Sequence, residues 1–278
     1  MSRTIILIHG AWLTPASWTR FRERYEAQGY RVLAPAWPLM ERPVTQLRSM
    51  PDSGLASLGI RDIVDRYERL IRVQAEAPIL IGHSFGGLFV QLLLDRGLGA
   101  AGVAISPAPP FGVLPAPRAV WSSRRVFAHV SGWHRVASMG YRSFAQDFAQ
   151  TLPETEKPAA YYAHIVPAPG RIFFEAALGV HTAVGFDNPV RPPLLLIAAE
   201  YDRTVTPGMV RANFRKQYRT DTPTAIHEFA DRSHWLCNET GWQAVADLAL
   251  HWSVGKARND QPAVREGASE DMPLPLPA

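Results

Sequence analysis

Short apolar runs along the chain alternate with segments whose apolar positions recur every three or four residues. A short continuous apolar run, bounded by glycine, proline or polar residues, is typical of a strand buried on both faces of a parallel sheet. Strands are predicted in this way at residues 4–8, 30–34, 77–83, 101–105, 193–198 and 224–229.

Helical periodicity is clearest at residues 60–71, where apolar side chains share one face and charged side chains lie between them. The apolar positions are Ile60, Ile63, Val64, Tyr67, Leu70 and Ile71. Residues 85–94 are apolar almost all round, which indicates a buried central helix. Further helices are expected at residues 15–28, 207–218 and 238–252. The alternation predicts an α/β fold with a mainly parallel six-stranded sheet and helices on both faces.

Three segments fall outside this alternation. Residues 35–59 are rich in proline, serine and glycine without a clear period, so we expect a loop. Residues 107–192 begin with several prolines and show helical stretches at 119–129, 141–150 and 172–178. They predict a helical cap, or lid, inserted into a core formed by residues 1–106 and 193–254. Residues 255–278 are predicted to be a disordered tail, with a proline-rich docking segment as the alternative.

Composition narrows the function classes. A chain of 278 residues with 47% hydrophobic content suits one large α/β domain with an insertion. The net charge of +4 is small, and the arginines are distributed along the whole sequence without a basic cluster, which argues against nucleic-acid binding. The single cysteine, Cys237, excludes an internal disulfide and a multi-cysteine metal site; it is either a small buried side chain or a reactive thiol.

The N-terminal apolar run at residues 5–8 is too short for a signal peptide or a membrane-spanning helix. We therefore expect a cytoplasmic protein without membrane attachment. A mature form from which a leader had been removed would look the same.

The run at residues 77–81 leads into Gly-His-Ser-Phe-Gly at residues 82–86 and then directly into the predicted helix. A serine at such a turn adopts crowded backbone torsions, and the glycines two residues before and after it relieve the clash. The hydroxyl is then left exposed beyond the carboxyl end of a strand. The pattern predicts Ser84 as a nucleophile.

A serine hydroxyl needs a base to take its proton and a third group to orient that base. His234 is the candidate base, because it lies in the loop between the last strand and the last helix. Asp202 is the candidate acid, because it lies just past the end of the strand at 193–198. Glu200 and Asp231 are rivals, although Asp231 shares a short loop with His234 and cannot easily reach its ring.

The oxyanion formed in acyl transfer needs two donors that are positioned before the reaction. One is expected from the N–H of Phe85, directly after Ser84 at the start of a helix. The other is expected from the N–H of Ala11, with Trp12 as the alternative. His9 and His83 are expected to shape the backbone of these motifs, whereas His164 and His181, in the insertion, are candidate pocket residues.

The chain resembles the α/β-hydrolase superfamily over about residues 4–254. The resemblance rests on the order Ser84, Asp202, His234 along the chain and on the first strand, which leads into His9-Gly10. The resemblance implies the α/β-hydrolase fold, a helical cap, a catalytic triad and an oxyanion hole at Ala11 and Phe85. Two features depart from the family. Residues 35–39 lack the D-x-x-G-x-G-x-S often found there, and the antiparallel first strands of larger relatives are missing. Neither departure touches the triad.

The implied activity is hydrolysis of a carboxylic ester of a small to medium apolar substrate through an acyl-enzyme, without a cofactor or a metal ion. The partner is a small molecule, and the sequence leaves the oligomeric state open. The expected pocket walls, besides Phe85, are Trp12, Trp37, Phe111, Val205 and Trp235.

The same triad also serves other reactions, so the alternatives are a cofactor-free lyase, perhydrolase, amidase, lactonase or acyltransferase. Epoxide hydrolases and haloalkane dehalogenases resemble the chain less, because they carry aspartate where this chain has Ser84. A more remote alternative is a non-catalytic ligand receptor that keeps the triad.

Overall fold

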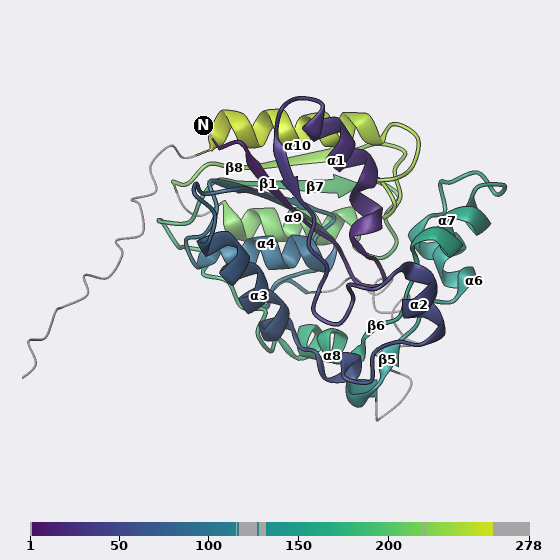
Figure 1. Ribbon diagram of the computed structural model, residues 1–278. Coiled ribbons are helices and arrows are strands. Elements are labelled where there is room, and N and C mark those ends of the chain that lie inside the picture. The colour runs from purple at the N-terminus through teal and green to yellow at the C-terminus, as the bar shows by residue number, and fades with distance from the viewer. Residues whose placement is uncertain (1, 115, 117–126, 128–131, 219–220, 258–278) are drawn as a thin grey trace, which may run out of the picture.

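A six-stranded, fully parallel sheet runs through the middle of the protein in the computed structural model, which describes residues 2–114, 116, 127, 132–218 and 221–257 (Figure 1). The strand order is β2-β1-β3-β4-β7-β8. The strands are β1 (Thr4–Ile8), β2 (Arg31–Leu33), β3 (Ile79–His83), β4 (Ala101–Ile105), β7 (Leu194–Ala199) and β8 (Thr224–Phe229). The predicted strands and their parallel pairing are confirmed. Because β2 and β3 lie on opposite sides of β1, the direction in which successive strands are added to the sheet reverses at β1. Ligands of open α/β sheets bind at such a topological switch point.

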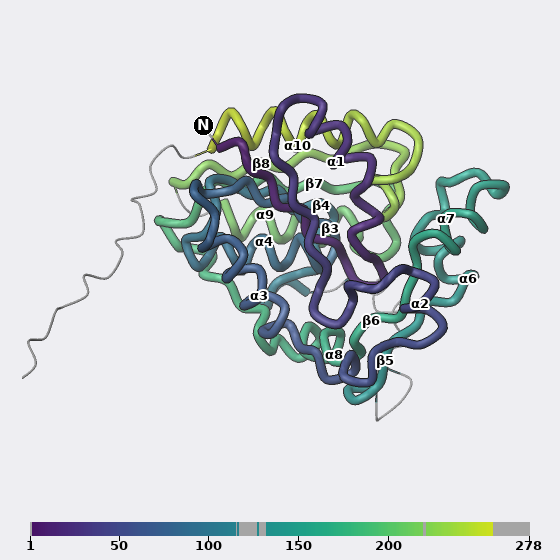
Figure 2. Tube along the Cα trace, viewed as in Figure 1, coloured from purple at the N-terminus to yellow at the C-terminus, as the bar shows by residue number. Residues whose placement is uncertain are grey.

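Helices cover both faces of the sheet, as predicted. α1 (Thr19–Glu26) and α10 (Trp242–Lys256) lie on one face, and α3 (Ile60–Arg72), α4 (Phe85–Asp95) and α9 (Pro207–Gln217) lie on the other (Figures 1 and 2). The alternation of each strand divides the core between them. Ile5 and Leu7 pack with α1 and α10, whereas Ile6 and Ile8 pack with α3 and α4.

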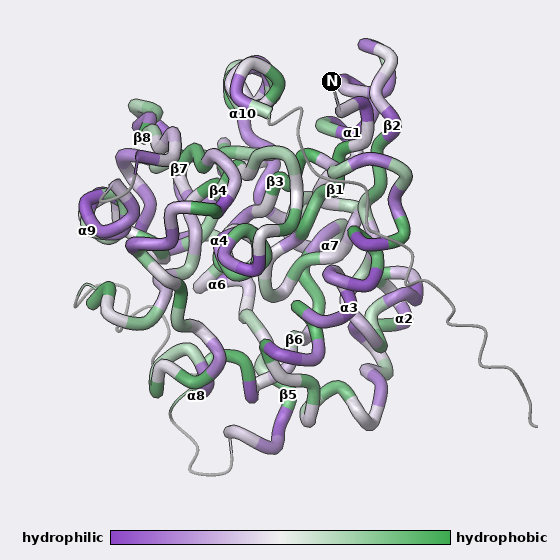
Figure 3. The backbone as a smooth tube through the Cα atoms, turned by 90° about the vertical axis from the view of Figure 1, so that its left-hand side faces the viewer, coloured by the Kyte–Doolittle hydropathy of each residue, from purple (hydrophilic) through white to green (hydrophobic). Residues whose placement is uncertain are grey.

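The helix boundaries differ from the sequence predictions in two places. The predicted helix at 15–28 is a 3₁₀ turn, Pro15–Trp18, followed by α1, and α10 begins at Trp242, not at residue 238. Within the described residues, no helix is long and apolar enough to cross a membrane. In Figure 3 the hydrophilic colour gathers on outer helices such as α9, while β1 is mostly hydrophobic.

The prediction of a loop at residues 35–59 was wrong. The segment contains α2 (Val44–Ser49) and a 3₁₀ turn, Leu55–Ser57. Both are too short to show a helical period, and each buries a single leucine, Leu47 or Leu55. Distant contacts hold the segment in place: the guanidinium of Arg48 donates to the Ile165 carbonyl oxygen 2.5 Å away and to that of Tyr161.

The described residues between 107 and 192 form short elements at one end of the sheet, below and to the right in Figure 1. They are a 3₁₀ turn (Gly132–His134), β5 (Val136–Ala137), α6 (Tyr141–Ser143), a π-helical turn (Phe144–Phe148), α7 (Lys157–His164), β6 (Ala168–Pro169) and α8 (Gly170–Leu178). β5 and β6 form a separate antiparallel pair. The predicted helix at 172–178 is confirmed as α8, and the one at 141–150 is replaced by α6 and the π-helical turn. α7 was not predicted. The predicted helix at 119–129 lies outside the described residues except Phe127, as does nearly all of the predicted tail.

The turn from β3 into α4 is the tightest place in the fold. Ser84 has φ 56° and ψ −121°, a left-handed conformation that costs energy for any residue other than glycine. A Cβ on Gly82 would lie 2.1 Å from the Gly86 carbonyl oxygen, and one on Gly86 would lie 2.0 Å from the Ile8 carbonyl oxygen. Gly82 and Gly86 thus relieve the crowding within the turn, as the sequence predicts, and Gly86 also allows the turn to pass directly against the end of β1.

Gly86→Ala tests this packing. The added methyl group meets backbone on a neighbouring strand, so we expect a loss of about 3 kcal/mol in the free energy of unfolding. Gly255→Ala is the control, because its added Cβ meets nothing within 4 Å in α10; it should gain about 1 kcal/mol from helix propensity. Urea unfolding of both variants checks the prediction, and equal midpoints for Gly86→Ala and the wild type would contradict it.

Candidate active site

Four loops meet beyond the carboxyl ends of the strands, where the sequence places its candidate residues. The loops after β1, β3, β7 and β8 carry residues 9–12, Ser84, Asp202 and His234, respectively. All three side chains are buried, with exposed fractions of 7% for Ser84, 3% for Asp202 and 0% for His234. The edge of the sheet thus holds a hydroxyl, an imidazole and a carboxylate away from bulk water.

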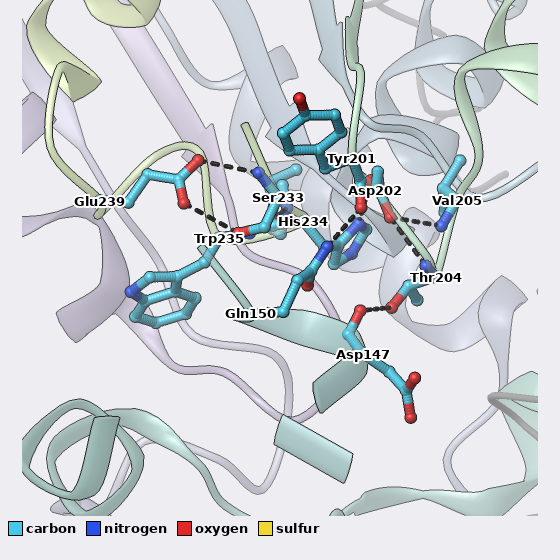
Figure 4. Close-up of polar contacts among 11 residues, drawn as sticks. Asp147, Gln150, Tyr201, Asp202, Thr204, Val205, Ser233, His234, Trp235 and Glu239 are labelled. Atoms are coloured by element: carbon cyan, nitrogen blue, oxygen red, sulfur yellow. Dashed lines mark hydrogen bonds and ion pairs between the residues drawn. The ribbon is translucent and has the colours of Figure 1, made fainter. Parts of the chain in front are cut away.

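The imidazole and the carboxylate form a direct pair. His234 Nδ1 lies 2.6 Å from Asp202 Oδ2, and Asp202 Oδ1 accepts the backbone N–H groups of Thr204 and Val205 at 2.8 and 2.7 Å (Figure 4). The carboxylate is thereby fixed on both oxygens, and its fully buried position is compensated by hydrogen bonds. The rival carboxylates have other partners: Glu200 Oε2 accepts the backbone N–H of Asp231 at 3.1 Å, and the Asp231 side chain binds the Tyr201 hydroxyl.

The second ring nitrogen of His234 has no hydrogen-bond partner among the described residues, although it is buried. Because Nδ1 donates to Asp202, a neutral ring carries its lone pair on Nε2. No hydrogen bond joins this nitrogen to Ser84 Oγ in the described part of the chain. Such contacts are often long without a bound ligand. The candidate site therefore holds an oriented imidazole whose second nitrogen has no partner among the described residues.

His83 fixes the other side of the base. Its Nε2–H donates to the His234 carbonyl oxygen at 2.9 Å, and the centroids of the two rings are 4.6 Å apart. Burial, and then the neighbouring His234, hold the pKa of His83 well below its ordinary value. His83 therefore stays neutral and keeps the loop that carries His234 against the end of β3.

The loop after β1 passes directly against the serine. A Cβ on Gly10 would lie 2.8 Å from Ser84 Cβ, so only glycine permits this approach. His9 stacks on Trp37, with 4.7 Å between ring centroids, and its Nε2 accepts the Trp37 N–H at 3.2 Å. Its Nδ1–H then donates to the Gly10 carbonyl oxygen at 2.9 Å. Burial lowers the pKa of His9 to about 4, so the neutral ring supports the loop, as expected for this motif.

The two expected oxyanion donors adjoin this contact. Ala11 follows Gly10, and Phe85 follows Ser84 as the first residue of α4, where backbone N–H groups have no partner within the helix. The alternative donor, Trp12, is itself left-handed, with φ 62°. Its carbonyl oxygen accepts the N–H of Val166 at 2.9 Å.

The segment at residues 144–151 lies over the base and is tied to its loops. The Phe148 ring meets the His234 ring edge-on at 4.6 Å between centroids. Four hydrogen bonds fix the segment. The Thr204 hydroxyl donates to the Asp147 carbonyl oxygen, and Gln150 donates to the Tyr201 carbonyl oxygen (Figure 4). Arg203 donates to the Gln146 carbonyl oxygen, and the Thr151 hydroxyl donates to Glu239. The sequence does not indicate a role for Phe148, because its contact with His234 is made between residues far apart in the chain.

Glu239 is another residue that sequence reasoning missed. Its buried carboxylate accepts the Ser233 N–H at 3.0 Å and the Ser233 hydroxyl at 2.8 Å, directly before His234 (Figure 4). It also accepts the Thr151 hydroxyl, so one side chain joins the histidine loop to the 144–151 segment. No motif marks it; only its burial reveals it.

The five residues expected to form the pocket walls differ in their burial and in their contacts. Trp12 and Trp235 are nearly buried, and Trp235 packs on Phe144 and His164. Val205 binds Asp202 through its backbone, and Trp37 is fully buried under His9. Phe111 is 60% exposed, and its ring lies against Gly179 at the end of α8. No described contact joins Phe111 to the other four.

His164 and His181 are the two histidines that the sequence suggests as pocket residues. His164 is mostly buried, its pKa is lowered to about 4 chiefly by burial, and its ring packs on Trp235. His181 is exposed. Cys237 is buried, and burial raises the pKa of its thiol well above the ordinary value, in line with a packed, unreactive side chain.

A hollow of about 280 Å³ lies behind Asp202, lined by Glu200, Tyr201, Asp202, Arg203, Thr206 and Pro207. It does not include the serine. Among the described residues, no group of three or more His, Cys, Asp or Glu side chains is placed to hold a metal ion.

Comparison with known proteins places these observations in a family. The family model described as "Alpha/beta hydrolase family" matches residues 5–248. No curated protein matches the chain.

Solved structures agree in fold at low sequence identity. A monoacylglycerol lipase from Paleococcus ferrophilus is similar with a TM-score of 0.65 and 17% identity, over 91% of this chain and 95% of that one. Polyneuridine aldehyde esterase gives 0.63 and 15%, over 91% and 100%. Tomato methylketone synthase I gives 0.64 and 14%, over 92% and 99%. These likenesses establish the fold.

Proposed function

The chain belongs to the alpha/beta hydrolase family, and we propose that it is a serine hydrolase that cleaves a carboxylic ester of a small to medium apolar substrate. The observation that carries the proposal is the buried His234–Asp202 pair, because the second ring nitrogen of His234 has no partner among the described residues and the ring lies 4.6 Å from that of His83, directly before Ser84. This is the arrangement that a serine needs to become a nucleophile at neutral pH.

In the first half of the proposed reaction, Ser84 Oγ attacks the ester carbonyl carbon while His234 Nε2 takes the hydroxyl proton. The carbonyl oxygen becomes an oxyanion, which the N–H groups of Ala11 and Phe85 stabilise. Collapse of this intermediate breaks the bond to the alcohol oxygen, and His234 gives its proton to the leaving alkoxide. The products of this half are the free alcohol and an ester on Ser84.

In the second half, water gives a proton to His234 Nε2 and attacks the acyl carbon. The same donors hold the oxyanion, Ser84 Oγ leaves with the proton from His234, and the carboxylic acid departs. Asp202 keeps the ring oriented throughout and stabilises its charged form. No cofactor or metal ion takes part in these steps.

The apolar substrate class is supported by the side chains around the serine turn. Phe85 and Trp12 are both nearly buried, and Phe148 covers the base. Large apolar walls with a few polar groups are typical of pockets for small uncharged ligands.

A second candidate is a cofactor-free lyase in which His234 acts directly on the substrate. The observation that favours it is the missing hydrogen bond between His234 Nε2 and Ser84 Oγ among the described residues. The two candidates differ in whether Ser84 is needed. The perhydrolase, amidase, lactonase and acyltransferase alternatives keep Ser84 as the nucleophile and differ in the group that leaves or accepts. A ligand receptor would show no turnover.

Ser84→Ala and a fluorophosphonate test the nucleophile. We expect the wild type to form a single adduct by intact mass and to turn over p-nitrophenyl esters, since an activated serine attacks phosphorus as well as carbon. Ser84→Ala should form no adduct and lose at least about 10³-fold in kcat. An unchanged adduct and rate in Ser84→Ala would exclude the serine mechanism.

Asp202→Asn tests the acid. The amide keeps the shape of the side chain but favours the wrong ring tautomer, so kcat for p-nitrophenyl acetate should fall by about 10⁴-fold. Glu200→Gln is the matched control and should stay within about threefold of the wild type, because its carboxylate contacts Asp231 and not the ring. If Glu200→Gln causes the large loss and Asp202→Asn does not, the assignment of the acid is wrong.

A further inference from the structure

α8 is fixed at both ends of its first two turns, first to residue 135 of the same 107–192 segment and then to residues of the core. At its start, the Gly170 N–H donates to the Arg135 carbonyl oxygen at 2.9 Å, and a Cβ on Gly170 would lie 2.3 Å from that oxygen. Further along, the fully buried Glu175 accepts the Ile60 N–H at 2.6 Å, at the start of α3. Arg171 binds Glu175 and the Ser57 carbonyl oxygen. The side chains between these points cannot easily move aside.

Phe173 lies between the two anchors and faces the serine turn. Its ring centroid is 4.6 Å from that of Trp12 and 5.2 Å from that of Phe85, and only 6% of the residue is exposed. Phe85 carries one proposed oxyanion donor, and Trp12 directly follows the other. Among the described ring contacts, Phe173 is the only one from the insertion that reaches both.

The loop on the other side of Phe173 is also held in place. The Trp12 indole N–H donates to the Ala137 carbonyl oxygen at 3.0 Å, and the Trp12 carbonyl oxygen accepts the Val166 N–H. Ala137 belongs to β5 and Val166 lies just before β6, so the small sheet of the insertion supports the loop after β1. The three rings therefore form a wall with fixed backbone on every side.

Reaction geometry assigns this wall to one part of an ester. In the proposed acyl-enzyme the acyl carbon is bonded to Ser84 Oγ and its oxygen points to the N–H groups of Ala11 and Phe85, so the acyl chain takes the remaining direction, away from His234. The rings of Trp12, Phe85 and Phe173 lie next to the two donors and would meet a chain that extends there. The alcohol must instead lie at His234 Nε2, which protonates it, on the side that Phe148 covers.

We propose that Phe173 limits the length of the acyl group accepted at Ser84, as a fixed wall that excludes longer chains. The inference rests on the proposed function, in which Ser84 carries the acyl group. Each methylene that an apolar pocket gains or loses changes kcat/KM by about 10-fold or more.

The test is Phe173→Ala, assayed with p-nitrophenyl acetate, butyrate, hexanoate and octanoate. The ratio of kcat/KM for octanoate to that for acetate should rise at least about 10-fold. Phe173→Leu, which removes less volume and is the safer variant for folding, should give a smaller rise in the same direction. Thermal unfolding shows which variants are folded.

Phe174→Ala is the matched control, because the adjacent ring contacts Phe127 and Trp133 and not the serine turn. Its octanoate-to-acetate ratio should equal that of the wild type. An unchanged ratio in folded Phe173→Leu or Phe173→Ala, or an equal rise in Phe174→Ala, would overturn the proposal.

A binding measurement separates this inference from the proposed function. In a Ser84→Ala background no ester is cleaved, and calorimetry measures binding of butyrate and octanoate. Adding Phe173→Ala should tighten octanoate about 10-fold and leave butyrate unchanged; no change for octanoate would overturn the inference. Failure of the wild type to react with a fluorophosphonate would instead remove the proposed function, and the binding result would still decide the role of Phe173.

Discussion

The hydrogen bond between His234 Nδ1 and Asp202 Oδ2, 2.6 Å long and fully buried, is the contact on which the rest of the site depends. It joins the loops after β7 and β8, and it leaves the lone pair of the imidazole on Nε2. Around it, the backbone N–H groups of Thr204 and Val205 fix the carboxylate, and His83 fixes the backbone of His234. Close packing at Gly82 and Gly86 allows the turn after β3 to place Ser84 at the same edge of the sheet.

The described residues between 132 and 178 flank the candidate site on two sides. Residues 144–151 are hydrogen-bonded to the loop of Asp202 and, through Glu239, to the loop of His234. α8, with β5 and β6, holds the loop after β1 and places Phe173 beside Phe85. Phe148 packs on the ring of His234, and Phe173 packs on the rings of Trp12 and Phe85, beside the proposed oxyanion donors. Substitutions in these residues are therefore expected to affect both substrate specificity and the orientation of the His234 ring.

Much of the fold and the central residues could be predicted from the sequence, because their signals are local. A buried strand appears in the sequence as an apolar run, and the turn from β3 into α4 needs glycines at two set positions, as the short distances at Gly82 and Gly86 explain. The contact between Asp202 and His234 could be predicted because parallel strands end at one edge of the sheet. The short helix α2, by contrast, has no period and depends on Arg48 reaching residues more than a hundred positions away. Phe148, Phe173 and Glu239 were missed for the same reason: only tertiary contacts give them a role.

Trapping the acyl-enzyme is the measurement that tests the central claim most directly. Wild-type protein mixed with p-nitrophenyl acetate should release a burst of p-nitrophenol close to one equivalent. Acid quenching within the burst should then show one added acetyl group by mass, located on Ser84 by peptide fragmentation. Turnover without a burst and without a modified Ser84, or an acetyl group on any other residue, would contradict the account.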